Sequence, residues 1–272
     1  MPDESRKSPP IRLRDITLRL GGRVILENLS LELPPGRITA IMGPSGAGKT
    51  TVLRLITGQL RPDAGEVWVG DSRVDQLNSR ELNRLRRRMG VLLQNGALLT
   101  DLTCFDNVAL PLREHTDLPE SLIRRLVLLK LETVGLRGAA DLYPRELSGG
   151  MNRRVATARA MALDPDLMLY DEPFAGLDPI SLGVSLRLIR DISQALETTS
   201  VVITHDVGEV QRFADHCCII SDRQVVAQGP PESLANSDHA LVHQFLNGLA
   251  DGPVPFHYPA PEFADDLLAE RR

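Results

Sequence analysis

Eight residues near the start of the chain have types and spacing suited to holding phosphate groups. Residues 43–50 (GPSGAGKT) match the pattern G-x-x-x-x-G-K-[ST] and follow a short apolar run at 38–42. Glycines let backbone N–H groups face a phosphate, and the start of a helix adds partial positive charge. In such a loop Lys49 reaches the β- and γ-phosphates, and the Thr50 hydroxyl ligates Mg²⁺. A chance glycine-rich turn is the alternative, and the flanking strand and helix argue against it.

A second candidate is a pair of carboxylates at the end of another apolar run. Residues 167–170 (LMLY) lead directly into Asp171 and Glu172. One acid in this position can bind Mg²⁺, and the next can polarise a water that attacks a phosphoryl group. A strand that simply ends in acidic residues explains this segment equally well when it is taken alone. The phosphoryl-transfer interpretation gains support because both runs are expected in one parallel sheet.

A third candidate combines a serine and two glycines at the start of a helical pattern. Ser148, Gly149 and Gly150 precede a predicted helix at residues 152–163. Serine is a favoured N-cap, and the N–H groups of a helix N-terminus suit an anion. An ordinary cap with a flexible turn is the alternative, so this segment counts only in combination with the other two.

These residues need a scaffold, and the hydrophobic patterning predicts an α/β fold. A strand, a helix and a strand at 167–170, 179–196 and 201–204 predict a parallel sheet. The region from about 99 to 163 is mainly helical and is interpreted as an inserted lobe. The other predicted elements are strands at 11–20, 24–33 and 38–42, a helix at 49–56, a strand pair within 66–74, an amphipathic helix at 121–132 and a final helix near 239–249.

The composition excludes several classes of protein. With 272 residues and 42% hydrophobic side chains, the chain can bury a sizeable core. A net charge of -5 argues against a dedicated nucleic-acid binder. No apolar run approaches the roughly 18 to 20 residues of a membrane-spanning helix, and the polar start lacks the apolar segment of a signal peptide. Three cysteines, Cys104, Cys217 and Cys218, lack C-x-x-C spacing and fit reduced thiols that pack in a cytosolic protein.

Taken together, the motifs resemble those of the ATP-binding subunits of ABC transporters, over nearly the whole chain. They occur in the family's order: Walker A at 43–51, the Q-loop glutamine Gln94, the signature at 147–150, Walker B at 167–171, the catalytic base Glu172, the D-loop at 175–178 and the switch histidine His205. The resemblance implies a P-loop NTPase: an ABC-type nucleotide-binding domain with a RecA-like core, an antiparallel β subdomain and the helical lobe.

The resemblance also implies the roles of individual residues in Mg²⁺-dependent ATP hydrolysis. ATP would lie between the Walker A of one subunit and the signature of a second copy, in a head-to-tail dimer. Catalysis is assigned to Glu172, His205, Lys49 and Gln94, and Mg²⁺ binding to Thr50, Gln94 and Asp171. The nucleotide contacts are assigned to Gly43, Pro44, Ser45, Gly46, Ala47, Gly48, Lys49, Thr50, Thr51, Ser148, Gly149, Gly150 and Asp178.

Two further stretches, 105–116 (FDNVALPLREHT) and 250–259 (ADGPVPFHYP), are similar to the ATPase of the Mla-type phospholipid transporter, which maintains lipid asymmetry in Gram-negative envelopes. Residues 174–179 (FAGLDP) share this likeness. It implies a peripheral protein on the cytoplasmic face of the inner membrane. Its partners would be a multi-spanning permease, an MCE-domain lipid-binding subunit and a small STAS-domain subunit, with no nucleic acid. An importer of a polar solute is the alternative, followed by a non-transport ABC ATPase.

The expected organisation is a flexible N-terminus at 1–10, an ATPase domain at 11–249 with its helical lobe at about 97–164, and a tail at 250–272. The tail contains the anchors Phe256, Tyr258, Phe263, Leu267 and Leu268, and we expect it to pack across the second ATPase subunit. Residues 94–116 are the expected docking surface for the permease, with ordinary helical packing as the alternative.

Two departures from the family pattern and one basic run complete the sequence-based picture. Leu20 stands where many relatives place an aromatic residue that stacks on adenine, and Met151 replaces the usual glutamine of the signature. The arginines of residues 80–88 are predicted to lie on one helix, with Leu82, Leu85 and Met89 as its buried stripe. A solvated face is the preferred interpretation of this run, and anionic lipid headgroups are the alternative.

Overall fold

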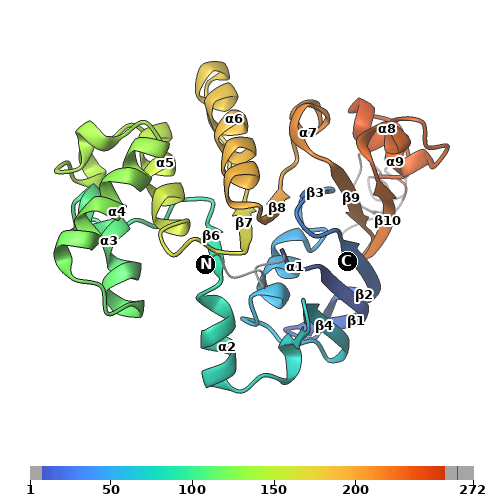
Figure 1. The fold of residues 1–272 in the computed structure, drawn as a ribbon. Helices are drawn as coiled ribbons and strands as arrows, with labels where there is room; N and C mark the ends of the chain where they lie inside the picture. Colours follow the sequence, from blue (N-terminus) through green and yellow to red (C-terminus); the bar gives the residue numbers. More distant parts are fainter. Residues whose placement is uncertain (1–7, 255–261, 263–272) are drawn as a thin grey trace, which may run out of the picture.

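A computed structural model describes residues 8–254 and residue 262. Its centre is a six-stranded sheet in the order β10-β9-β3-β8-β7-β6 (Figure 1). The strands are β3 (Ile38–Met42), β6 (Met89–Leu92), β7 (Leu167–Asp171), β8 (Thr199–Ile203), β9 (His216–Ser221) and β10 (Gln224–Gly229). All neighbours pair in parallel except β9 and β10, so the predicted parallel sheet is confirmed.

The inner strands are apolar because both faces of the sheet are covered. Successive side chains of a strand point to opposite faces. On β3, Met42 joins the core that extends to the helices, whereas Ile41 joins a second core under the antiparallel sheet. On β7, Tyr170 and Leu169 divide between the two cores in the same way. Because both faces are buried, these strands are continuous apolar runs, whereas a half-exposed strand would alternate between apolar and polar residues.

A second sheet of four antiparallel strands has the order β2-β1-β4-β5. It contains β1 (Ile11–Leu20), β2 (Arg23–Leu33), β4 (Ala64–Val69) and β5 (Ser72–Arg73). Gly21 and Gly22 connect β1 to β2 with positive φ angles of 56° and 77°, which suit glycine in a hairpin turn. The predicted hairpin and antiparallel β subdomain are therefore confirmed.

The middle of the chain forms helices that gather on the side of Figure 1 opposite the antiparallel sheet. They are α3 (Cys104–His115), α4 (Glu120–Thr133) and α5 (Gly149–Ala160). The remaining helices are α1 (Lys49–Ile56), α2 (Ser79–Arg86), α6 (Pro179–Leu196), α7 (Val207–Phe213), α8 (Pro231–Ala235) and α9 (Ala240–Asn247), with 3₁₀ turns at Val74–Gln76, Arg137–Ala139 and Pro144–Glu146.

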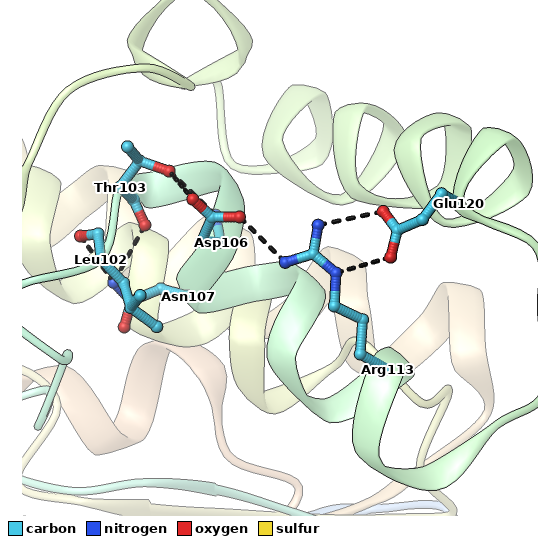
Figure 2. A network of polar contacts seen from close by, with 6 residues as sticks. All are labelled: Leu102, Thr103, Asp106, Asn107, Arg113 and Glu120. Carbon is cyan, nitrogen blue, oxygen red and sulfur yellow. Dashed lines mark hydrogen bonds and ion pairs between the residues drawn. The ribbon is translucent and has the colours of Figure 1, made fainter.

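Polar contacts fix α3 at both of its ends, as Figure 2 shows. The buried Asn107 accepts the Leu99 N–H at 2.8 Å and donates to the carbonyls of Leu99, Leu102 and Thr103. Arg113 donates to both carboxylate oxygens of Glu120, at 2.7 and 3.0 Å, and to Asp106 at 2.9 Å. The loop that precedes α3 and the start of α4 are thus both held to this helix.

The basic run at 80–88 differs from its prediction. Helix α2 ends at Arg86, and Met89 begins β6, where it pairs with Leu167 of β7. The strand forms because its neighbour in the sheet supplies backbone hydrogen bonds that helical spacing cannot reveal. Arg88 pairs with Asp166 across this junction. The arginines therefore do not all lie on one helix, because Arg87 and Arg88 follow the end of α2.

Smaller differences concern the ends of elements. Helix α5 begins at Gly149 and ends at Ala160, earlier at both ends than the predicted 152–163. The N-terminus at residues 1–7 and all five tail anchors lie outside the described residues. Within the described part of the chain, no helix has both the length and the apolar character needed to cross a membrane. Cys104, Cys217 and Cys218 are buried free thiols, as expected.

Candidate active site

The glycine loop leaves the end of β3 and enters α1, as the sequence predicts. Gly43 has a φ of 144°, and a Cβ atom at this position would collide with the carbonyl oxygen of Ile220 on β9. Gly48 has a φ of 96°, and a Cβ there would lie 2.7 Å from the side chain of Leu26 on β2. Both sheets therefore press against the loop, and glycine is needed where they do.

Lys49 is the first residue of α1, and its side chain lies against the loop. The residue is only 8% exposed, and its Nζ donates to the carbonyls of Gly43 at 2.8 Å and Pro44 at 3.0 Å. Burial lowers the pKa of Lys49, while the charges of Glu172 and Asp171 act to raise it. A compact ammonium is thus held against the loop carbonyls, where two nearby carboxylates oppose the effect of burial on its charge.

Thr50 and Asp171 are 121 residues apart in sequence, and the fold brings them together. The Thr50 hydroxyl donates to Asp171 Oδ1 at 3.2 Å. Asp171 is buried, and desolvation raises the pKa of its carboxyl group, which a nearby cation would reverse. A hydroxyl and a carboxylate oxygen are hard ligands of the kind that Mg²⁺ prefers, so this pair fits the predicted metal.

Glu172 and His205 form the second long-range pair of the site. Glu172 has a φ of 50°, and its N–H donates to the Ile203 carbonyl of β8 at 3.0 Å. Its Oε2 atom lies 2.9 Å from Nδ1 of His205. The glutamate side chain is 16% exposed and the histidine 66%, so the pair lies at the surface with the acid on the inner side.

The topology explains why these groups converge. Strands β3, β8 and β7 are consecutive neighbours and run parallel (Figure 1). Their carboxyl ends lead into the glycine loop, His205 and the Asp171–Glu172 pair, respectively. Ligands of open α/β sheets bind outside the carboxyl ends of the strands. The structure thus places Lys49, Thr50, Asp171, Glu172 and His205 at one edge of the sheet.

Outside the glycine loop and α1, the other predicted residues share no hydrogen bond with this cluster in the described part of the chain. Ser148 caps α5 by accepting the Met151 N–H at 3.2 Å, and Gly149 beside it is exposed. No hydrogen bond among residues 8–254 joins this segment to the glycine loop. Asp178 caps α6 through the N–H groups of Ile180 and Ser181, and its bonds with Ser181 lower its pKa.

Gln94 is exposed and lies two residues after the end of β6. It borders a groove of about 440 Å³, the Gln94 groove, which is also lined by Asn95, Leu98, Thr100, Arg145, Asn152 and Arg153. Arg153 and Arg159 of α5 hold the loop next to this groove, and no role was predicted for either of them. Their position just after the signature was the available signal.

Comparison with known proteins identifies the family. The model of the ABC transporter family matches residues 26–175, more than half of the chain. This protein belongs to the ABC transporter family. The ABC-type nucleotide-binding fold predicted from the motifs is therefore confirmed.

Two of the curated ABC relatives are similar over almost their full length, and a third over about two thirds of its own. The intermembrane phospholipid transport system ATP-binding protein MlaF of Haemophilus influenzae is 56% identical, over 95% of this chain and 98% of its own. The protein of the same name from Escherichia coli K12 is 53% identical, over 95% and 96%. The probable ribonucleotide transport ATP-binding protein mkl of Mycobacterium leprae is 39% identical, over 90% and 70%.

Solved ABC structures share the fold. The dimeric ATP-binding cassette MJ0796, in a post-hydrolysis state with ADP and Pi, superposes with a TM-score of 0.75 at 30% identity, covering 81% of this chain and 98% of its own. The cbiO1 component from Clostridium perfringens gives a TM-score of 0.77 at 26% identity, covering 84% and 90%. The chain is thus an ABC ATPase in fold and family.

Proposed function

We propose that this chain is the ATP-hydrolysing subunit that energises phospholipid transport by an inner-membrane ABC transporter. The observation that supports this most strongly is its 56% identity, over nearly both full lengths, to a relative named for intermembrane phospholipid transport. The cluster around the glycine loop supplies the chemistry. The chain itself would sit peripherally on the cytoplasmic face of the membrane.

In this proposal each residue of the cluster has a defined part. The loop N–H groups and Lys49 bind the β- and γ-phosphates of ATP. Glu172 orients and polarises the attacking water, and His205 positions Glu172 and contacts the γ-phosphate. Ser45, Gly46, Ala47 and Thr51 complete the nucleotide contacts of the loop.

Thr50 and Asp171 would hold Mg²⁺, with Gln94 approaching it from the neighbouring loop. Within residues 8–254, no group of three or more histidine, cysteine, aspartate or glutamate side chains forms a metal site. Proteins bind Mg²⁺ through one or two carboxylates, of which Asp171 would be one, while phosphates and water supply the other ligands. Bound there, Mg²⁺ would neutralise charge that develops on the phosphates.

The exposed signature supports a role for a second copy of the chain. Ser148, Gly149 and Gly150 offer helix N–H groups to an anion but lie apart from the glycine loop. In a head-to-tail dimer they would close over ATP bound to the partner, with Asp178 near the same interface. The similar cassette MJ0796 is dimeric, which agrees with this arrangement.

The Gln94 groove is the proposed docking site for the permease. Leu93 and Leu99 beside it are 45% and 47% exposed, although both are large and apolar. A membrane-embedded partner that offers an apolar helix end would cover them. An MCE-domain subunit and a small STAS-domain subunit complete the proposed complex.

A polar-solute importer is the second candidate, because a relative at 39% identity is named for probable ribonucleotide transport. Affinity purification of the tagged chain from membranes, with identification of the bound subunits and lipids, separates the two. We expect a multi-spanning permease, an MCE-domain protein and phospholipid. Recovery of a solute-specific permease without these partners would overturn the proposal.

A further inference from the structure

Arg153, near the start of α5, joins two loops that are distant in sequence. Its Nη1 donates to the carbonyl of Ala175 at 2.8 Å, and its Nη2 donates to the carbonyl of Gln94 at 3.3 Å. One planar guanidinium thus spans the loop after β6 and the loop between β7 and α6. The side chain also lines the Gln94 groove.

Both loops are connected to the proposed chemistry. The Ala175 N–H donates to the Glu172 carbonyl at 3.3 Å, so Ala175 lies one turn beyond the proposed base and three residues before Asp178. On the other side, Arg159 donates to the carbonyls of Gly96 at 2.9 Å and Ala97 at 2.8 Å. Helix α5 therefore holds the groove loop at several carbonyls, but within this helix only Arg153 also donates a hydrogen bond to the loop of Glu172.

The contacts of Arg153 require an arginine and not merely a cation. Both of its partners are backbone carbonyls. Desolvation lowers the pKa of Arg153, and no carboxylate contributes to the shift. The arginine fork presents several N–H donors in a fixed plane, whereas a lysine ammonium is a single point at the end of a flexible stem. A lysine could satisfy one of the two carbonyls but would not hold both loops at a set separation.

We propose that Arg153 is a positioning residue that couples the permease-facing loop at residues 94–99 to the segment at 172–178. Movement of the loop when the permease engages the Gln94 groove would shift the Gln94 carbonyl, and Arg153 would pass that shift to Ala175 and hence to Glu172. This inference rests on the proposed docking of a permease in the groove. It adds a residue that lines the docking groove and acts on Glu172 only through the two loops that it holds.

The test measures how strongly the membrane partners stimulate ATP turnover. The chain is purified alone and in its complex, and the complex is placed in vesicles of phosphatidylethanolamine and phosphatidylglycerol. The ratio of the two turnover rates is compared for the natural chain and for Arg153→Gln. We expect the ratio to fall about fivefold or more, as typical coupling energies imply. ATP affinity is measured in chains that also carry Glu172→Gln. It should be the same with and without Arg153→Gln, whereas a general loss of structure would lower it.

Arg154→Gln is the matched control, because Arg154 on the same helix donates to a single carbonyl, that of Val134, at 3.1 Å. It removes an equal charge and a similar bond, and it should keep the natural ratio. Arg153→Lys keeps the charge, and its ratio should still be reduced. If Arg153→Gln fails to assemble into the complex, the ratio measured for Arg153→Lys tests the proposal by itself.

The outcomes separate this inference from the proposed function. The role of Arg153 is overturned if the natural complex is stimulated and Arg153→Gln or Arg153→Lys keeps the full natural ratio of turnover rates. That result leaves the transport proposal standing. An equal loss in Arg154→Gln also overturns it, because the effect would then be one of helix stability. A natural complex without any stimulation overturns the docking proposal and this inference with it.

Discussion

His205 Nδ1 lies 2.9 Å from Glu172 Oε2, although the two residues are 33 positions apart in sequence. They follow neighbouring parallel strands, β8 and β7, so the register of these strands sets their separation. The positive φ of Glu172, 50°, turns its side chain at the end of β7. A histidine that bonds one carboxylate oxygen leaves the other free to accept a proton from water. The pair therefore has the geometry of a base held in place by its neighbour.

Replacing Glu172 by Gln should separate binding from hydrolysis. The amide has nearly the same shape but cannot accept a proton, so we expect turnover to fall by about a hundredfold or more. ATP should still bind, because Lys49 and the loop N–H groups are unchanged. Phosphate release and equilibrium ATP binding measure the two properties, and normal turnover in this variant would refute the assigned base.

Lys49→Ala should abolish ATP hydrolysis and weaken ATP binding, because the phosphates lose the buried ammonium at the loop. Lys130→Ala is the matched control among the three lysines of the chain. Lys130 is also buried, and its ammonium pairs with Asp164, far from the loop in sequence. Its loss should cost about 1 to 3 kcal/mol in the free energy of unfolding and leave turnover intact. Equal loss of activity in both variants would mean that stability, and not phosphate binding, explains the Lys49 effect.

Gly43→Ala should destabilise the chain even without nucleotide. The new methyl would strike the Ile220 carbonyl, and a φ of 144° is unfavourable for alanine, so we expect a loss of at least about 2 kcal/mol. Gly183→Ala is the counterpart inside α6, where no atom lies within 4 Å of the added methyl. That change should stabilise the chain by up to about 1 kcal/mol, as alanine favours helix. Urea unfolding compares the free energy of unfolding of the two variants. A fall in stability for both would contradict the close contact assigned to Gly43.

Leu20→Tyr should tighten ATP binding. Leu20 ends β1 and is 38% exposed, in the hairpin whose second strand contacts the loop at Gly48. An aromatic ring here could stack on adenine, and such pairs imply an affinity gain of about two- to tenfold. Titration with ATP and with GTP distinguishes stacking from a general effect on the loop. An unchanged affinity for both nucleotides would show that Leu20 does not face the base.

Arg113→Gln should reduce stability at neutral pH more than in acid. Hydrogen bonds from Arg113 lower the pKa values of Asp106 and Glu120 (Figure 2). The folded chain therefore binds protons at these two groups less readily than the unfolded chain. Their contribution to the free energy of unfolding is present at pH values above the ordinary carboxyl pKa. It is lost as the pH falls through the lowered values. The difference in urea midpoint between the natural chain and the variant should thus be larger at about pH 7 than at about pH 3. A constant difference would contradict this assignment.

Much of the fold could be predicted because local patterns and tertiary structure agree. The buried runs of β3 and β7 and the glycines of the first hairpin have only one reasonable interpretation. Strand β6 could not be predicted, because Met89 continues the helical spacing of Leu82 and Leu85. Its state is decided by pairing with β7, which is almost 80 residues away. Strand β9, with Cys217 and Cys218, was not predicted either, although its run of buried residues has the same pattern as β3.

The site residues could likewise be predicted only in part. The phosphate loop could be predicted from the residues alone, since its glycines, Lys49 and Thr50 are contiguous. The role assigned to His205 came only from the family resemblance, because nothing local marks a histidine after a strand. Arg153 was not predicted because its partners are carbonyls of two loops, so its position just after the signature was the one signal that the sequence offered.

The most direct test of the account is ATP-dependent movement of a phospholipid by the purified complex. The complex is reconstituted in donor vesicles that carry a fluorescent phospholipid, and transfer to an acceptor is followed with the natural chain and with Glu172→Gln. We predict transfer that requires ATP with the natural chain and stops with the variant, although the variant still binds ATP. Transfer at the same rate with both chains, or ATP-driven movement of a polar solute without phospholipid, would contradict the account.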